Sequence, residues 1–73
     1  MAKRYRIELE STLDTDWSEW LGGLALEHGP DGRTILTGEL ADQSALHGLL
    51  ARIRDLGIPI LLVARLRAVD SQL

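Results

Sequence analysis

The stretch Arg-Tyr-Arg-Ile-Glu-Leu-Glu at residues 4–10 alternates strictly between charged and apolar side chains, apart from the ring of Tyr5. Successive side chains of an extended strand point to opposite faces, so Tyr5, Ile7 and Leu9 share one face and the charged residues share the other. An antiparallel strand with one face on the core and one in water has this pattern. We therefore predict a half-buried strand here.

The remaining periodic segments predict three more strands and one long helix. We expect strands at residues 24–28, 33–39 and 58–67, with Asp31-Gly32 as the turn between the first two. Residues 43–56 are expected to form the main helix, with Asp42 as its N-cap. Its apolar stripe would consist of Leu46, Leu49, Leu50, Ile53 and Leu56.

A second, short helix is expected just after the first strand. Asp16 can cap it, and Glu19, three residues later, could complete a capping box. Trp17 and Trp20 would share one face of this helix, and Gly22-Gly23 would end it.

The order of these elements predicts an α+β fold. Strand-helix-strand-strand-helix-strand is typical of a ferredoxin-like β-α-β-β-α-β sandwich, here with a short first helix and a four-stranded antiparallel sheet. Right-handed crossovers would place both helices on one face, with strand order 4-1-3-2. If the first helix is only a turn, the alternative is a sheet under one long helix. We expect a single domain over residues 1–73, with residues 68–73 as a frayed tail.

Composition limits the classes of protein that the chain can belong to. With 73 residues, it is long enough for one small domain. The absence of cysteine excludes disulfides and thiolate metal sites, so a partner subunit is the expected additional source of stability. No apolar run is long enough to span a membrane, and the basic start lacks the apolar block of a signal peptide. We therefore expect a cytoplasmic protein that does not associate with membranes.

The last predicted strand is apolar on both faces, which suggests that another polypeptide covers it. Half-buried strands alternate between apolar and polar residues, whereas strands covered on both sides are apolar throughout. A second copy of the chain is the simplest cover, because twofold homodimers dominate oligomers. The sheets could stack through their helix-free faces or pair edge to edge; alternatively, the tail or a loop of the same chain covers the strand. Alternation places Ile60, Leu62, Ala64 and Leu66 on one face, and Leu61, Val63, Arg65 and Arg67 on the helix-free face.

Arginines are expected to gather on the helix-free face. If the first and last strands pair antiparallel, Arg4 and Arg6 meet Arg65 and Arg67 there. Such a cluster could bind an anion or a nucleic acid. A formal net charge of −3 disfavours nucleic acid as a partner, and acids across a dimer are the more ordinary partners for these arginines. We therefore predict an interface that contains Leu61, Val63, Arg65, Arg67, Arg4 and Arg6.

Four side chains are candidates for ligand or partner contacts. Trp17 and Trp20 could form a hot spot, or simply pack the core. His47 and Arg54 flank the apolar stripe of the long helix, where they could surround a bound ligand or simply lie at the edge of the core. Nucleophile-elbow, phosphate-loop and histidine metal-binding motifs are absent from the sequence. We therefore expect no enzyme, metal site or cofactor.

One segment resembles a known group of sequences. Residues 42–59, with the pattern D-Q-x-A-L-H-G-L-L-x-R-I-R-D-L-G-x-P, look like a group of short uncharacterised bacterial proteins. The pair Trp17 and Trp20 and the segment Leu36-Thr37-Gly38 fit the same group. The resemblance implies a stand-alone small domain and assigns no activity. More distantly, the element order is similar to ACT-type ligand-binding domains.

These observations support three hypotheses. The first is a non-catalytic, self-associating module that binds a protein partner. The second is a small-molecule sensor of ACT-like architecture that uses His47, Arg54 and Trp20. The third is a weak anion or nucleic-acid binder that uses the arginine cluster.

Overall fold

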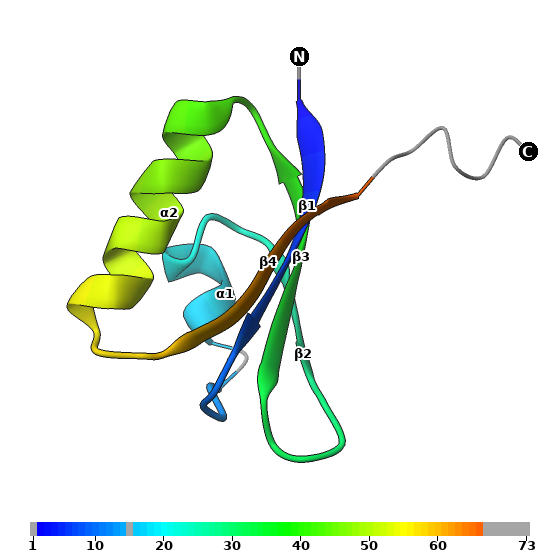
Figure 1. The fold of residues 1–73 in the computed structure, drawn as a ribbon, viewed down its shortest axis with the longest axis vertical. Helices are drawn as coiled ribbons and strands as arrows, with labels where there is room; N and C mark the ends of the chain where they lie inside the picture. Colours follow the sequence, from blue (N-terminus) through cyan, green and yellow to red (C-terminus); the bar gives the residue numbers. More distant parts are fainter. Residues whose placement is uncertain (1, 15, 67–73) are drawn as a thin grey trace, which may run out of the picture.

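The computed structural model describes residues 2–14 and 16–66 and shows an α+β fold with a four-stranded antiparallel sheet and two helices (Figure 1). Arg67 and the predicted tail at residues 68–73 lie outside the described residues. The elements are β1 (Lys3–Leu9), α1 (Trp17–Trp20), β2 (Ala25–His28), β3 (Thr34–Leu40), α2 (Gln43–Asp55) and β4 (Ile60–Leu66).

The strand order in the sheet is β2-β3-β1-β4, which reads 4-1-3-2 from the β4 edge. β1 lies inside the sheet and pairs antiparallel with β3, from Lys3–Leu40 to Leu9–Thr34. On its other side β1 pairs antiparallel with β4, and the register shifts between Glu8 and Leu9. β2 and β4 are therefore the two edges of the sheet.

The buried face of β1 is the one that the alternation predicts. Tyr5, Ile7 and Leu9 are buried, and both helices lie on this face of the sheet (Figure 1). Leu36 of β3 faces Ile7 and is also fully buried. The core is completed by side chains from α2 and from the segments around α1: Leu13, Leu21, Leu24, Leu40, Leu46, Leu49 and Ile53.

The boundaries of α2 follow from its terminal residues. The side chain of Asp42 accepts a hydrogen bond of 2.8 Å from the backbone N–H of Ala45, as expected of an N-cap. Gly57 has a φ of 75°, which a residue without a Cβ adopts readily, and it ends the helix. Leu56 is 37% exposed, so the apolar stripe does not extend that far. The reason is that Leu56 is already the C-cap, beyond the last helical turn.

The expected capping of the first helix is wrong. α1 is a single turn, and Asp16 has helical backbone angles and no side-chain cap hydrogen bond. An N-cap side chain reaches the first turn from an extended backbone, which Asp16 does not have. The carbonyl of Asp14 instead accepts the N–H of Trp17 at 3.0 Å, and Ser18 Oγ donates to the carbonyl of Leu24 at 2.6 Å.

The predicted faces of β4 are wrong from Leu62 onward, whereas Ile60, which faces the buried Leu9, lies on the helix side as predicted. Residues that face each other across an antiparallel pair lie on the same side of the sheet. Val63 faces Ile7 and Arg65 faces Tyr5, so both lie on the helix side. The helix-free side instead receives the three residues that face Glu8, Arg6 and Arg4, namely Leu62, Ala64 and Leu66. Alternation groups residues by face, but only the register with β1 decides which face is which.

Two glycines give opposite predictions for stability. A Cβ on Gly38 would lie 2.5 Å from Cδ2 of Leu24, which is buried, so we expect Gly38→Ala to destabilise the fold by about 1–3 kcal/mol. A Cβ on Gly48 in α2 would meet no atom within 4 Å, so Gly48→Ala should stabilise it by up to about 1 kcal/mol. Urea unfolding at one protein concentration measures both. Equal effects of the two substitutions would contradict this account.

Candidate interaction surface along the last strand

β4 is an edge strand that exposes a run of apolar side chains. Ile60, Leu61, Leu62 and Val63 are 38%, 48%, 40% and 42% exposed. We call these four residues the β4 apolar run. β4 pairs with β1 on one side, and no other described strand pairs with its second side. Unpaired backbone groups beside exposed apolar side chains are typical of a surface that pairs with another chain.

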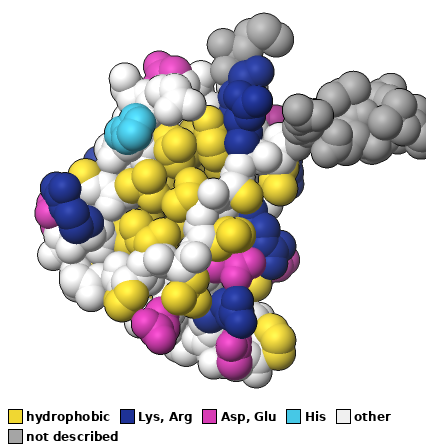
Figure 2. Space-filling view, in the orientation of Figure 1, with side chains coloured by type: hydrophobic (Ala, Val, Ile, Leu, Met, Phe, Trp, Pro, Cys, Tyr) yellow, Lys and Arg dark blue, Asp and Glu magenta, His cyan; other side chains and the backbone are white. Residues whose placement is uncertain are grey.

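The β4 apolar run is exposed on both sides of the sheet. Leu62 faces Glu8 and so lies on the helix-free side. Ile60 and Val63 lie on the helix side, where they remain 38% and 42% exposed. Figure 2, in the same view as Figure 1, shows hydrophobic side chains gathered between α2 and β4. Partly buried Leu50 and Ile58 pack against the core.

The opposite edge of the sheet is different. β2 has four residues, against seven in β4, and two of its residues, Glu27 and His28, are exposed and polar. His28 is also held in place by a 2.5 Å hydrogen bond between its Nε2 and the carbonyl of Leu13. Short edges with charged or polar side chains resist pairing with other strands. β4 is therefore the edge that is more open to a partner.

The helix-free face carries a network of ion pairs. Glu8 binds Arg6 at 2.9 Å and Arg33 at 2.7 Å, and Arg33 also binds Asp31 at 2.8 Å. The hydrogen bond from Arg33, and then that from Arg6, lowers the pKa of Glu8. The hydrogen bond from Arg33 likewise lowers the pKa of Asp31.

Among the described residues, the predicted arginine cluster is divided between the two sides of the sheet. Arg4 and Arg6 lie on the helix-free side, but Arg65 lies on the helix side, and Arg67 is outside the described residues. Arg6 pairs with Glu8 of its own strand. The prediction failed because it assumed the opposite face for Arg65.

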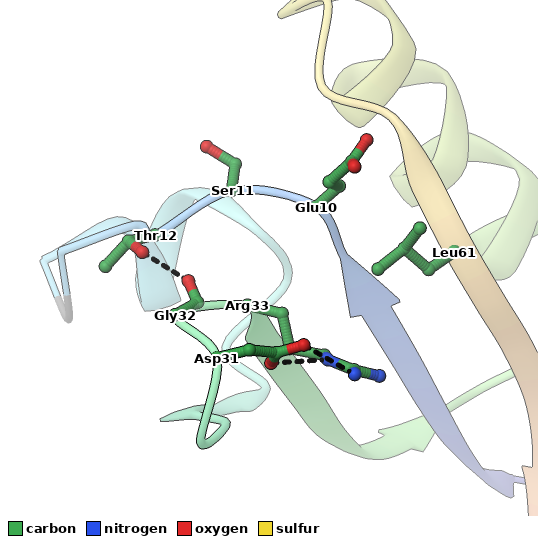
Figure 3. Close-up of a pocket in the computed structure, with 7 residues that line it drawn as sticks. All are labelled: Glu10, Ser11, Thr12, Asp31, Gly32, Arg33 and Leu61. Carbon is green, nitrogen blue, oxygen red and sulfur yellow. Dashed lines mark hydrogen bonds and ion pairs between the residues drawn. The ribbon is translucent and has the colours of Figure 1, made fainter.

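A shallow hollow of about 340 Å³ lies beside the start of β4 (Figure 3). Figure 3 shows Leu61 reaching from β4 toward Glu10, which follows β1. The hydroxyl of Thr12 donates to the carbonyl of Gly32, which ties the two loops together. The guanidinium of Arg33 is already held by Asp31 and Glu8, through hydrogen bonds from each of its three nitrogens. The hollow is lined by Glu10, Ser11, Thr12, Asp31, Gly32, Arg33 and Leu61.

The tryptophans take different positions. Trp17 packs partly buried against the core, whereas Trp20 is 45% exposed. Their rings meet edge to face, with centroids 5.6 Å apart. The guanidinium carbon of Arg52 lies 5.7 Å from the centre of the Trp20 ring, and Arg52 donates to the Trp20 carbonyl at 2.9 Å. The sequence gives no sign of this role for Arg52, because nothing in the local pattern links residues 32 positions apart.

The other two predicted contact residues lie along α2. His47 and Arg54 are exposed and seven residues apart, which is about 10 Å along a helix. Arg54 pairs with its neighbour Asp55 at 3.7 Å. In the described part of the chain, no hydrogen bond or ion pair joins His47, Arg54 and Trp20 into one site. Nor do the described residues contain a group of three His, Cys, Asp or Glu side chains that could hold a metal ion.

Together, the fold and this surface define a small α+β domain with one exposed apolar edge strand. The chain belongs to a family described as a domain of unknown function (DUF8691), whose model matches residues 4–64. This match agrees with the resemblance to uncharacterised proteins seen in the sequence. No curated protein and no solved structure matches the chain. Within the described residues, neither helix has the length and apolar character needed to cross a membrane.

The ion pairs of Glu8 make stability depend on pH. A pKa that is lower in the folded state than in the unfolded state contributes stability above the unfolded value, and this stability is lost as the pH falls through the folded value. We therefore expect the free energy of unfolding of Glu8→Gln to fall less steeply with decreasing pH, below the ordinary glutamate pKa of 4.5, than that of the original chain. Urea unfolding midpoints between neutral and acid pH measure this effect.

A matched control is available two residues away. Glu10 is exposed, and none of the ion pairs among the described residues includes it, so Glu10→Gln should keep the steeper profile of the original chain. Identical profiles for the original chain and Glu8→Gln would show that the network contributes nothing to the acid sensitivity.

Proposed function

We propose that this chain is a non-catalytic module that self-associates through the β4 side of its sheet. The observation that supports this most directly is the β4 apolar run, four consecutive apolar residues exposed on an unpaired edge strand. Contiguous exposed apolar surface is characteristic of protein interaction sites. A second copy of the chain is the proposed partner, because twofold homodimers are the commonest oligomers. The proposal keeps the cytoplasmic location expected from the sequence.

The energy available from the run is modest. Full burial of a Val, Leu or Ile side chain contributes about 1.5–3 kcal/mol. Because these side chains keep roughly two-fifths of their exposure, covering each one contributes roughly 1 kcal/mol, or about 8 kcal/mol for the eight side chains of two copies. Association costs about 4–15 kcal/mol in lost freedom. Apolar burial alone therefore supports a weak dimer, and a stable one needs hydrogen bonds along the open edge.

A fold assignment accompanies this proposal. We propose that the domain is a reduced ferredoxin-like sandwich in which α1 has shrunk to one turn. The strand order 4-1-3-2 and the position of both helices on one face support this assignment. The shortness of α1 also leaves α2 as the main cover of the sheet.

One observation favours a second candidate function, the sensing of a small molecule. Hydrophobic side chains gather at the surface between α2 and β4, and an apolar ligand would bind on this patch (Figure 2). Ligand binding would raise the melting temperature in proportion to the logarithm of ligand concentration, so a thermal-shift screen tests it. The anion-binding hypothesis stays a prediction, with Arg4 and Arg6 on the helix-free side and Arg65 on the helix side.

A charge placed in the β4 apolar run should separate the copies. We expect the original chain to be dimeric at high concentration by sedimentation equilibrium, and Val63→Asp to be monomeric, because burying an unpaired carboxylate is costly. Ala25→Asp places the same charge on the exposed β2 edge and should leave the dimer intact.

Circular dichroism and urea unfolding would show whether Val63→Asp still folds, and Leu62→Lys provides a second charge in the run on the other face. A monomeric original chain at all concentrations would overturn the proposal. So would either substitution, Val63→Asp or Leu62→Lys, if the variant folds and remains as dimeric as the original chain.

A further inference from the structure

We infer that two copies pair edge to edge through β4, antiparallel, around a twofold axis that passes beside Val63. This inference rests on the proposed self-association and specifies its geometry. The β4 edges of the two copies would join their sheets into one continuous sheet, with the α2 helices of both copies on the same face.

Edge pairing fits the surface better than stacking of the helix-free faces does. Stacking would bury the ion pairs of Arg6 and Arg33 with Glu8 near the middle of the sheet. Removing paired charges from water carries a desolvation cost of several kcal/mol per ion. Edge pairing leaves that network exposed. It also supplies partners for the backbone N–H and C=O groups on the outer side of β4.

The position of the axis follows from the length of the strand. In a twofold antiparallel pair, residues at equal distances from the axis face each other. Val63 is the midpoint of the seven residues of β4, so an axis there gives the longest possible overlap of the two strands. The register shift near Leu61 then falls toward both ends of the ladder, once in each copy, and leaves its centre regular.

Arg65 and Pro59 disfavour the neighbouring registers. An axis at Ala64 brings the two copies of Arg65 to diagonal positions about 7–8 Å apart. An axis at Leu62 pairs Arg65 with Pro59, which has no N–H to donate. With the axis at Val63, the two Arg65 residues lie four positions apart, about 13 Å along the strand. That separation exceeds the screening length of about 8 Å at physiological salt.

The same register matches apolar side chains with each other. Val63 faces its own copy on the helix side, where it is 42% exposed in the single chain. Leu62 faces Ala64 of the other copy on the helix-free side. Arg65 lies opposite the stretch around Leu61, where the register shifts and which carries no charged side chain. No like charges oppose each other in this arrangement.

Cysteine cross-linking tests the register directly, because the chain has no cysteine of its own. Facing residues on antiparallel strands have Cβ atoms about 4.5–5.5 Å apart, close to the spacing of about 3.5–4.5 Å in a disulfide. We expect oxidised Val63→Cys to run mostly as a covalent dimer on a non-reducing gel. Leu61→Cys should stay monomeric on the same gel, because its copy lies four positions away.

A mixture of two variants provides a second, independent readout. Leu62→Cys and Ala64→Cys should each cross-link poorly alone, because their own copies are diagonal. Mixed together, they should form a covalent heterodimer, because Leu62 of one copy faces Ala64 of the other. Ala25→Cys on the β2 edge is the control for random collision.

The outcomes separate this inference from the proposed function. If the original chain sediments as a dimer but Leu61→Cys cross-links as well as Val63→Cys, the register is overturned while self-association stands. If the dimer forms and neither Val63→Cys nor the mixture cross-links beyond the Ala25→Cys control, edge pairing itself is overturned. A monomeric original chain overturns both proposals.

Discussion

The pairing of β1 on both of its sides is the constraint on which the rest of the structure depends. Ile7 lies between Leu36 of β3 and Val63 of β4, and it is fully buried. The alternation of β1 then decides which side of the sheet becomes the core. Once that side is set, α2 has one apolar face to cover, and the charged residues of β1 define the opposite surface.

The candidate interaction surface is a consequence of how little helix this chain has. α1 is one turn long, which leaves α2 as the main helix over the sheet. One helix of 13 residues does not cover a four-stranded sheet, so β4 at its edge keeps its apolar side chains exposed. A small domain buries a smaller share of its surface than a large one does, so its own chain has less material to cover such a strand.

The sequence predicted the regular elements better than the contacts between them. β1, the long helix and its Asp42 cap are confirmed, because each has a strong local signal: strict alternation, a helical stripe or a capping side chain. The predicted cap at Asp16 is wrong, because the backbone of Asp16 is helical and its side chain makes no capping hydrogen bond. The contact between Trp20 and Arg52 had no local signal, because it joins distant segments.

By itself the sequence predicted a strand at residues 58–67, of which the structure has Ile60–Leu66, and it showed that the first half of this strand is apolar on both faces. Only the tertiary structure decided which way those residues point and that β4 lies at an edge. The physical reason is that side-chain period is a property of one strand, whereas face and edge depend on register with β1 and on where α2 packs. A one-residue change in that register turns Val63 and Arg65 from one side of the sheet to the other.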